Sequence, residues 1–252
     1  MANNSCSKLM RTTRRTRRRS RSKEAPVDSL PNELLIEVLA RVAAHSLTDL
    51  FNAKLSCKAF YEASKDSSVF QQISLEELQI VPWRISREAY FFFNKCMESG
   101  NPEALYRQGV VDYFSFMRLE YGIEYLQRAA NSGHDGAMYT LGIISLFSGD
   151  ELIKQQGMKT LSGLKNKARA SRKLRNCREE LKAILRKIWV RNPFRTNPLV
   201  VGKERPICCT MKGDQHKRRR GWESDDDDDI QCDACQCDRE VDSLCKMILY
   251  VF

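Results

Sequence analysis

The cysteines near the C-terminal end are the residues whose type and spacing come closest to a metal site. Four of them lie in one short stretch: Cys232, Cys235, Cys237 and Cys245. Cys232 and Cys235 have the Cys-x-x-Cys spacing with which two thiolates can share a tetrahedral zinc ion. Cys208, Cys209 and His216 lie upstream, but the two cysteines are adjacent and lack that spacing. We therefore predict ordinary reduced thiols and no metal, with structural zinc at the four C-terminal cysteines as the alternative.

Catalytic signatures are missing from the sequence. Its three histidines are His45, His134 and His216, and none stands in a Cys/His or Ser/His/Asp pattern. No glycine-rich phosphate-binding loop occurs, and glycines such as Gly109 and Gly142 are explained by close helix packing. We predict a protein that is not an enzyme and that needs no cofactor.

Positive charge is concentrated at the N-terminal end. The chain carries 42 lysines and arginines against 32 acids, a formal net charge of +10, but nine of the basic residues fall within the first 23 positions. The rest of the chain is almost neutral, which argues against nucleic acid as the main partner. We predict that residues 1–26 form a disordered basic tail, which is an import signal, an electrostatic nucleic-acid arm or a solvated segment. We expect a nuclear and cytoplasmic protein.

Membrane association is not expected. The apolar residues are too dispersed for a membrane span, which needs roughly 18 or more in succession. The N-terminal residues also lack the apolar core of a secretory signal. We therefore expect a protein without membrane partners.

From Pro26 onward the pattern changes to amphipathic helices. The first apolar group in helical spacing consists of Leu34, Leu35, Val38, Leu39 and Val42. Further apolar groups follow, and three short helices account best for residues 27–76. A unit of this size cannot bury so many apolar side chains by itself, so we expect a partner or a neighbouring domain to cover some of them.

Residues 84–165 contain an internal repeat. The stretch 96–111 matches 129–144 at an offset of 33, and five positions are identical: Ser99/Ser132, Gly100/Gly133, Ala104/Ala137, Tyr106/Tyr139 and Gly109/Gly142. Such a period is typical of helix-turn-helix solenoids. Residues 166–190 have the apolar spacing of a helix that caps the solenoid. We predict that residues 191–252 form a linker and an irregular, Cys-rich C-terminal segment that packs onto the body.

Several motifs resemble those of the F-box family. The stretch from Leu30 to Val42, LPNELLIEVLARV, is similar to the family's opening of Leu-Pro, an acid and a hydrophobic helix. Residues 56–60, SCKAF, are similar to its Val-Cys-Arg-x-Trp signature, and Val69-Phe70 to its Leu-Trp ending. The repeats resemble Sel-type repeats, relatives of the tetratricopeptide class, and an F-box followed by such repeats resembles a plant group. The predicted fold is all-α: a three-helix F-box, a short helix-turn-helix solenoid and a terminal helix.

The resemblance implies a function. F-box domains bind a Skp-type adaptor, which bridges to a cullin, while the rest of the chain captures the protein to be ubiquitinated. It implies that docking positions for the Skp-type adaptor are apolar residues of the first two helices: Leu30, Pro31, Leu34, Val38, Leu39, Leu47 and Leu50. We therefore predict a substrate-recruiting adaptor of a Skp-cullin-F-box ubiquitin ligase with an unknown substrate protein. The alternative is a ligase-independent nuclear scaffold that uses the Arg-rich tail.

Overall fold

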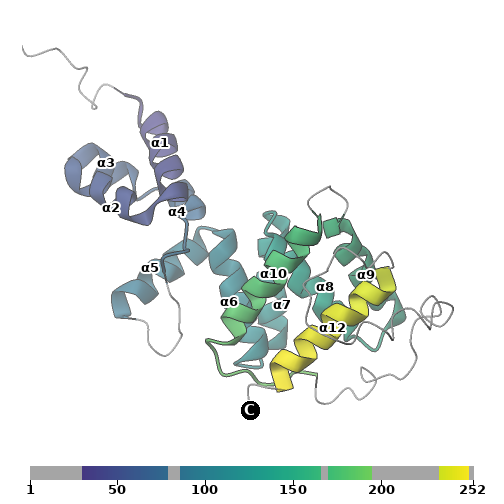
Figure 1. The fold of residues 1–252 in the computed structure, drawn as a ribbon. Coiled ribbons are helices and arrows are strands. Elements are labelled where there is room, and N and C mark those ends of the chain that lie inside the picture. Colours follow the sequence, from purple (N-terminus) through teal and green to yellow (C-terminus); the bar gives the residue numbers. More distant parts are fainter. Residues whose placement is uncertain (1–29, 79–85, 166–169, 195–232, 250–252) are drawn as a thin grey trace, which may run out of the picture.

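The computed structural model describes residues 30–78, 86–165, 170–194 and 233–249, and these residues form helices and their connections. The all-α prediction is thereby confirmed. Figure 1 shows an elongated molecule with α1–α4 at one end and α12 at the other. The predicted basic tail lies outside the described residues, as do Cys208, Cys209, His216 and Cys232. None of the helices in the described ranges has the length and apolarity that a membrane crossing requires.

The N-terminal unit contains four short helices where three were predicted. They are α1 (Asn32–His45), α2 (Leu47–Ser56), α3 (Lys58–Ala63) and α4 (Ser67–Gln72). The additional boundary arises at Cys57, whose extended backbone separates α2 from α3. Ser46 accepts a hydrogen bond from the Asp49 amide and Asp66 accepts one from the Ser68 amide, so each supplies an N-cap. Local capping therefore fixes the ends of α2 and α4.

The buried side chain of Asn101 is one of the contacts that join this unit to the helices that follow, α5 (Arg87–Glu98) and α6 (Pro102–Phe114). The Asn101 amide nitrogen donates hydrogen bonds to the carbonyl oxygens of Phe70 and Ile73, at 3.0 and 2.9 Å. Its amide oxygen accepts one from the Ala104 amide at 3.0 Å, which caps α6. The hydrophobic core of the N-terminal unit also includes Phe93 of α5. The two parts therefore share one interior.

The predicted repeat is present as two helix pairs. The first pair is α6 with α7 (Leu119–Asn131), and the second is α8 (Asp135–Leu146) with α9 (Glu151–Lys165). Gly100 and Gly133 begin the two pairs with φ of 82° and 84°, a conformation that glycine adopts without strain. Asn101 and His134 follow them and cap α6 and α8 in the same way.

Glycines at the centre of each pair allow the helix backbones to approach closely. A Cβ on Gly109 would lie 3.0 Å from the carbonyl oxygen of Gly122, and one on Gly157 would lie 2.8 Å from that of Gly142. Only glycine leaves space at such distances. The identical glycines in the two repeats thus set the separation of the helices.

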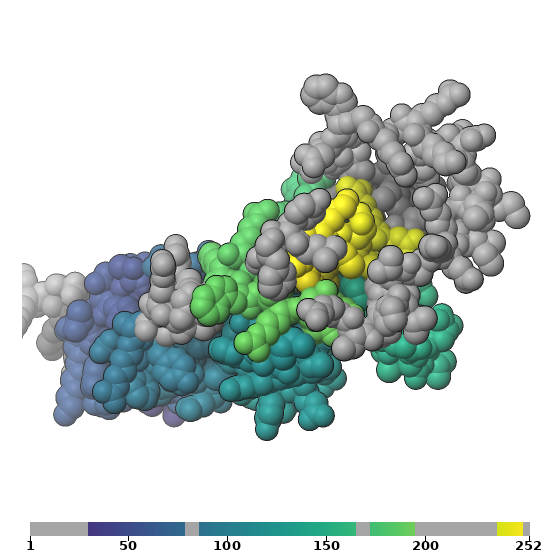
Figure 2. Space-filling model, turned by 90° about the horizontal axis from the view of Figure 1, so that it is seen from below, coloured from purple at the N-terminus to yellow at the C-terminus, as the bar shows by residue number. Residues whose placement is uncertain are grey.

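The C-terminal end of the solenoid is covered by two further helices, α10 (Ala170–Leu185) and α12 (Asp233–Leu249). The capping role predicted for residues 166–190 agrees with α10, which packs against α8 and α9. The C-terminal segment packs onto the body as expected, but residues 233–249 are helical rather than irregular. Figure 2 shows α12 beside α10, at the end of the molecule remote from α1–α4.

A buried ion pair holds α12 in place. The Glu240 carboxylate accepts hydrogen bonds from Nε and Nη2 of Arg178, at 2.8 and 2.6 Å, and from the Tyr139 hydroxyl at 2.7 Å. Gln236 donates a further bond to it at 2.6 Å. A carboxylate with this many donors is compensated for its burial. Glu240 therefore links α8, α10 and α12.

Two glycines of α9 provide a matched test of the packing. Gly157→Ala should lower the free energy of unfolding by about 1–3 kcal/mol, because the new methyl group would meet the backbone of α8. At Gly163 an added Cβ would meet no atom of another part of the chain within 4 Å. Gly163→Ala should therefore raise the free energy of unfolding by about 0.5–1 kcal/mol through helix propensity. Urea unfolding followed by circular dichroism measures both. Equal effects of the two substitutions would contradict the role of Gly157 in the close packing of α8 and α9.

Asn101 can be tested by a nearly isosteric change. Asn101→Asp keeps the oxygen that caps α6 but removes the donor to the Phe70 and Ile73 carbonyls and buries a charge beside them. We expect a loss of about 2–4 kcal/mol in the free energy of unfolding. Asn131→Asp, at the exposed end of α7, should change stability little. A similar loss in both variants would show that Asn101 has no special role.

Candidate partner-binding surfaces

An uncovered apolar stripe runs along α1. Leu30, Leu34 and Val38 are 48, 49 and 51% exposed. Leu34 and Val38 are four residues apart and so share one side of α1, and Leu30 lies just before the helix begins. Pro31 is also exposed at the beginning of the stripe. On α2, Phe51 and Leu55 are further exposed apolar side chains. We call Leu30, Pro31, Leu34 and Val38 the α1 stripe.

Two of the predicted docking residues are covered by the chain itself. Leu39 and Leu50 are only 1 and 2% exposed and pack with Val69 and Phe70 of α4 in the core. They cannot touch a partner while the unit stays folded, because their apolar surface is already covered. Leu47 is partly buried and packs against the same core.

A second surface is a groove of about 1070 Å³ along α6. One side is formed by residues 73–78 and α5, and the other by α7 and the C-terminal half of α10. α6 contributes Glu103, Arg107, Gln108, Val111 and Asp112 to the lining. We call this cavity the α6 groove.

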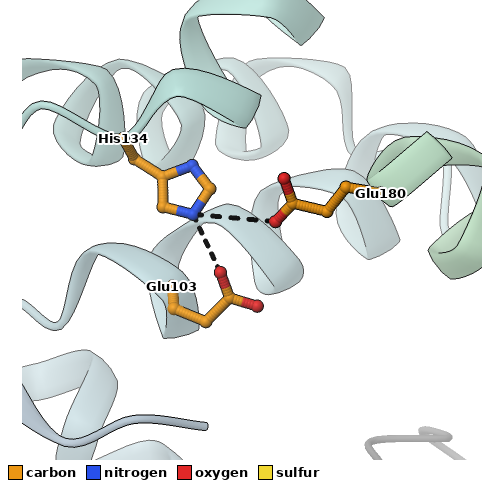
Figure 3. Close-up of side chains that lie close together, drawn as sticks. All are labelled: Glu103, His134 and Glu180. Carbon is orange, nitrogen blue, oxygen red and sulfur yellow. Dashed lines mark hydrogen bonds and ion pairs between the residues drawn. The ribbon is translucent and has the colours of Figure 1, made fainter. Parts of the chain in front are cut away.

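Three ionisable side chains from different helices meet beside the groove, as Figure 3 shows. The His134 Nδ1 atom accepts a hydrogen bond from the Ala137 amide at 3.1 Å, which is the N-cap of α8. Its Nε2 atom lies 2.8 Å from Glu103 Oε2 and 4.0 Å from Glu180 Oε1. Glu103 also pairs with Arg107, and the His134 ring stacks on Tyr106 with centroids 4.5 Å apart.

The cluster has the spacing of a metal site but the wrong protonation. One nitrogen and two carboxylate oxygens lie within 4.8 Å of one another, which a divalent ion could span. However, Nδ1 must be unprotonated to accept the Ala137 amide, so the neutral ring carries its proton on Nε2. That nitrogen donates to Glu103 and has no lone pair for a metal. Arg107 already neutralises Glu103, so these residues do not fit a metal ion.

The two glutamates differ in their pKa. Burial by itself raises the pKa of Glu103, but the hydrogen bond from His134 and the charge of Arg107 outweigh it and lower the pKa below its usual value. Burial and the neighbouring Glu103 charge raise the pKa of Glu180. Glu180 is thus the carboxylate whose charge the protein compensates less.

The candidate zinc cysteines are not brought together as four ligands. Cys237 is buried and Cys245 half-buried on α12, eight residues apart, which is about 12 Å along a helix. Zinc–sulfur bonds of about 2.3 Å cannot bridge that distance. Cys232 lies outside the described residues, and the structure does not describe the Cys235 side chain. Cys237 packs in the hydrophobic core of the repeats.

Sequence reasoning did not identify the groove residues or Glu240. Glu103, Asp112 and Glu180 come from two helices, and nothing in their spacing along the chain indicates that they line one cavity. For α12 a signal was present, since Cys237, Leu244 and Ile248 recur at helical spacing and are buried.

The raised pKa of Glu180 predicts a pH-dependent stability change. The folded protein binds this proton more tightly than the unfolded chain does, so ionisation above the usual value of 4.5 costs stability. Glu180→Gln should therefore raise the free energy of unfolding at neutral pH, and the gain should fade as the pH drops below 4.5. Urea titrations at the two pH values measure this. A gain that persists at low pH would point to packing instead.

Family comparisons agree with the two-part structure. Residues 27–76 match the F-box-like family, and residues 76–186 match the plant tetratricopeptide repeat family. Both families are typically non-catalytic interaction modules. No solved structure matches this chain.

Relatives named as F-box proteins occur in Arabidopsis thaliana. One is 36% identical over 138 residues, which are 55% of this chain and 46% of that protein. Another is 29% identical over 123 residues, 49% of this chain and 75% of that protein. The chain thus spans about half the length of the first and three quarters of the second. The chain is thus similar to an F-box-like domain followed directly by plant tetratricopeptide repeats.

Proposed function

We propose that this chain is a substrate-recruiting adaptor of a Skp-cullin-F-box ubiquitin ligase. The α1 stripe binds a Skp-type adaptor, which connects the chain to a cullin, and the repeats hold the protein to be ubiquitinated. The chain performs no catalysis and needs no cofactor in this role.

The exposed stripe on α1 carries the proposal. Full burial of a leucine or valine side chain contributes about 1.5–3 kcal/mol, and three such side chains of the stripe stay half exposed. The adjacent stripe of Leu35, Leu39 and Ala43 already supplies the core, so folding does not require the outer one. An apolar helix face of this kind is suited to insertion into a groove of a partner.

The repeats support the second half of the proposal. Solenoid repeats commonly use their grooved face to bind proteins. The α6 groove is lined in part by residues 73–78, at the end of the F-box-like domain. The shared core and the Asn101 hydrogen bonds connect the two surfaces. A target held in the groove would keep a defined position relative to the ligase.

The expectation of a nuclear and cytoplasmic protein remains a prediction, because residues 1–26 lie outside the described part of the chain. The ligase-independent scaffold differs from the proposal in one measurable property, which is whether a Skp-type adaptor binds.

Binding to a purified Skp-type adaptor, measured by calorimetry, tests the proposal. Leu34→Ala should weaken binding by about 2 kcal/mol, or about thirtyfold, because it removes an apolar anchor from the stripe. Leu152→Ala on α9, where the leucine is 75% exposed and distant from the stripe in sequence, should bind like the wild type.

The folded state is checked separately. Leu34→Ala should keep the wild-type circular dichroism spectrum and nearly the wild-type melting temperature, whereas Leu39→Ala should unfold more readily because Leu39 is a core residue. If the folded wild-type chain binds no Skp-type adaptor, the ligase role is wrong and the scaffold alternative gains support.

A further inference from the structure

Aromatic side chains surround the α6 groove without being needed for the core. The groove is lined by Tyr90 of α5, by Phe116 in the connection between α6 and α7, and by Tyr121 of α7. These side chains are 50, 46 and 62% exposed. Tyrosine and phenylalanine with this much free surface are typical of binding sites, because they bury a large area at a small entropic cost. Aromatic faces also attract cations.

Within the same groove, Asp112 is a buried carboxylate with an unmet hydrogen-bonding capacity. It is 2% exposed, and its Oδ1 atom has no hydrogen-bond partner. Oδ2 accepts one bond from Gln108 at 3.0 Å. The only charge recorded near Oδ1 within the described residues is Arg118 Nη1, 3.8 Å away on a side chain that is 62% exposed. A buried carboxylate in this state favours a further donor.

The charges of the groove leave its carboxylates in excess. The lining residues include four acids, Glu76, Glu103, Asp112 and Glu180. Of its three basic residues, Arg107 is already committed to Glu103 and to the Leu78 carbonyl oxygen. Lys187 is exposed, and Arg118 lies against the exposed Phe116 ring, 5.3 Å from its centroid. The interior therefore suits a cationic side chain that arrives with its own apolar neighbours.

We propose that the α6 groove binds a segment of the recruited protein that carries a lysine or arginine next to apolar side chains. The cationic group reaches Asp112 and displaces the loosely held Arg118, while its neighbours pack on Tyr90, Phe116 and Tyr121. This inference names the recognition chemistry of the recruiting role proposed above and rests on it.

Asp112 and Glu180 act at different ends of the groove. Asp112 offers an oxygen that is shielded from water, where a charge-assisted hydrogen bond is strong. Glu180 is 38% exposed at its side chain and lies on α10 beside His134 and Glu103, so it adds negative charge at the other end of the groove. A lysine or arginine long enough to reach Asp112 would keep its methylene groups against the aromatic rings.

Selection from a phage-displayed library of random peptides, with the immobilised full chain as bait, tests the proposal. We expect enriched peptides to share a lysine or arginine flanked by apolar residues. One such peptide is then synthesised together with its counterpart in which glutamine replaces the basic residue. Fluorescence polarisation should show that the counterpart binds about tenfold more weakly or worse.

Variants of the chain then locate the site. Asp112→Asn and Tyr121→Ala should each weaken the basic peptide by about tenfold, and Glu180→Gln should weaken it less. Glu151→Gln, which alters an exposed carboxylate of α9 outside the groove, should not. Tyr121→Ala changes a largely exposed side chain, so its effect can be read even if Asp112→Asn fails to fold.

The outcomes separate this inference from the ligase role. Leu34→Ala should lose the Skp-type adaptor but keep the basic peptide. If no peptide is enriched, if the enriched peptides lack basic residues, or if the groove variants bind normally, the inference is wrong while adaptor binding still stands. If the peptide binds and the Skp-type adaptor does not, the ligase role is wrong and the groove assignment stands.

Discussion

The relative position of the two partner-binding surfaces depends on the buried junction at which the amide of Asn101 lies. Its two donor bonds reach carbonyl groups at the end of the F-box-like domain, and its oxygen begins α6 of the repeats. All three bonds are buried, so each is costly to leave unmade. Because one planar group makes them together, the first repeat cannot rotate against the F-box-like domain without breaking several at once. The α1 stripe and the α6 groove are therefore parts of one body.

The two surfaces differ in the chemistry that they present. The α1 stripe is apolar and regular, as expected for a face that accepts a fixed partner. The α6 groove combines aromatic rings with carboxylates, and its polar interior rejects partners that cannot supply a matching charge. A constant partner on one surface and a selective site on the other would allow the protein to bridge two different kinds of molecule.

Sequence reasoning predicts best where one local rule decides the outcome. The offset of 33 and the paired glycines predicted the helix pairs, because only a glycine permits backbones to approach this closely. Leu34 and Leu39 show the limit. Both fit the F-box motif, yet one faces solvent and the other the core, since a helix that is apolar on two sides does not reveal which side its own chain covers. The α6 groove could not be predicted, because it forms from helices that meet only in the folded state.

The link between Tyr139 and Glu240 has a consequence for synthesis. The two residues are 101 positions apart, so α8 is made long before the helix that covers it. A chain still on the ribosome would present the apolar surface of α8 and α9 uncovered until α12 emerges. Premature truncation within α12 would remove this cover, leaving a product exposed to chaperones and proteases although both partner-binding surfaces had already been made.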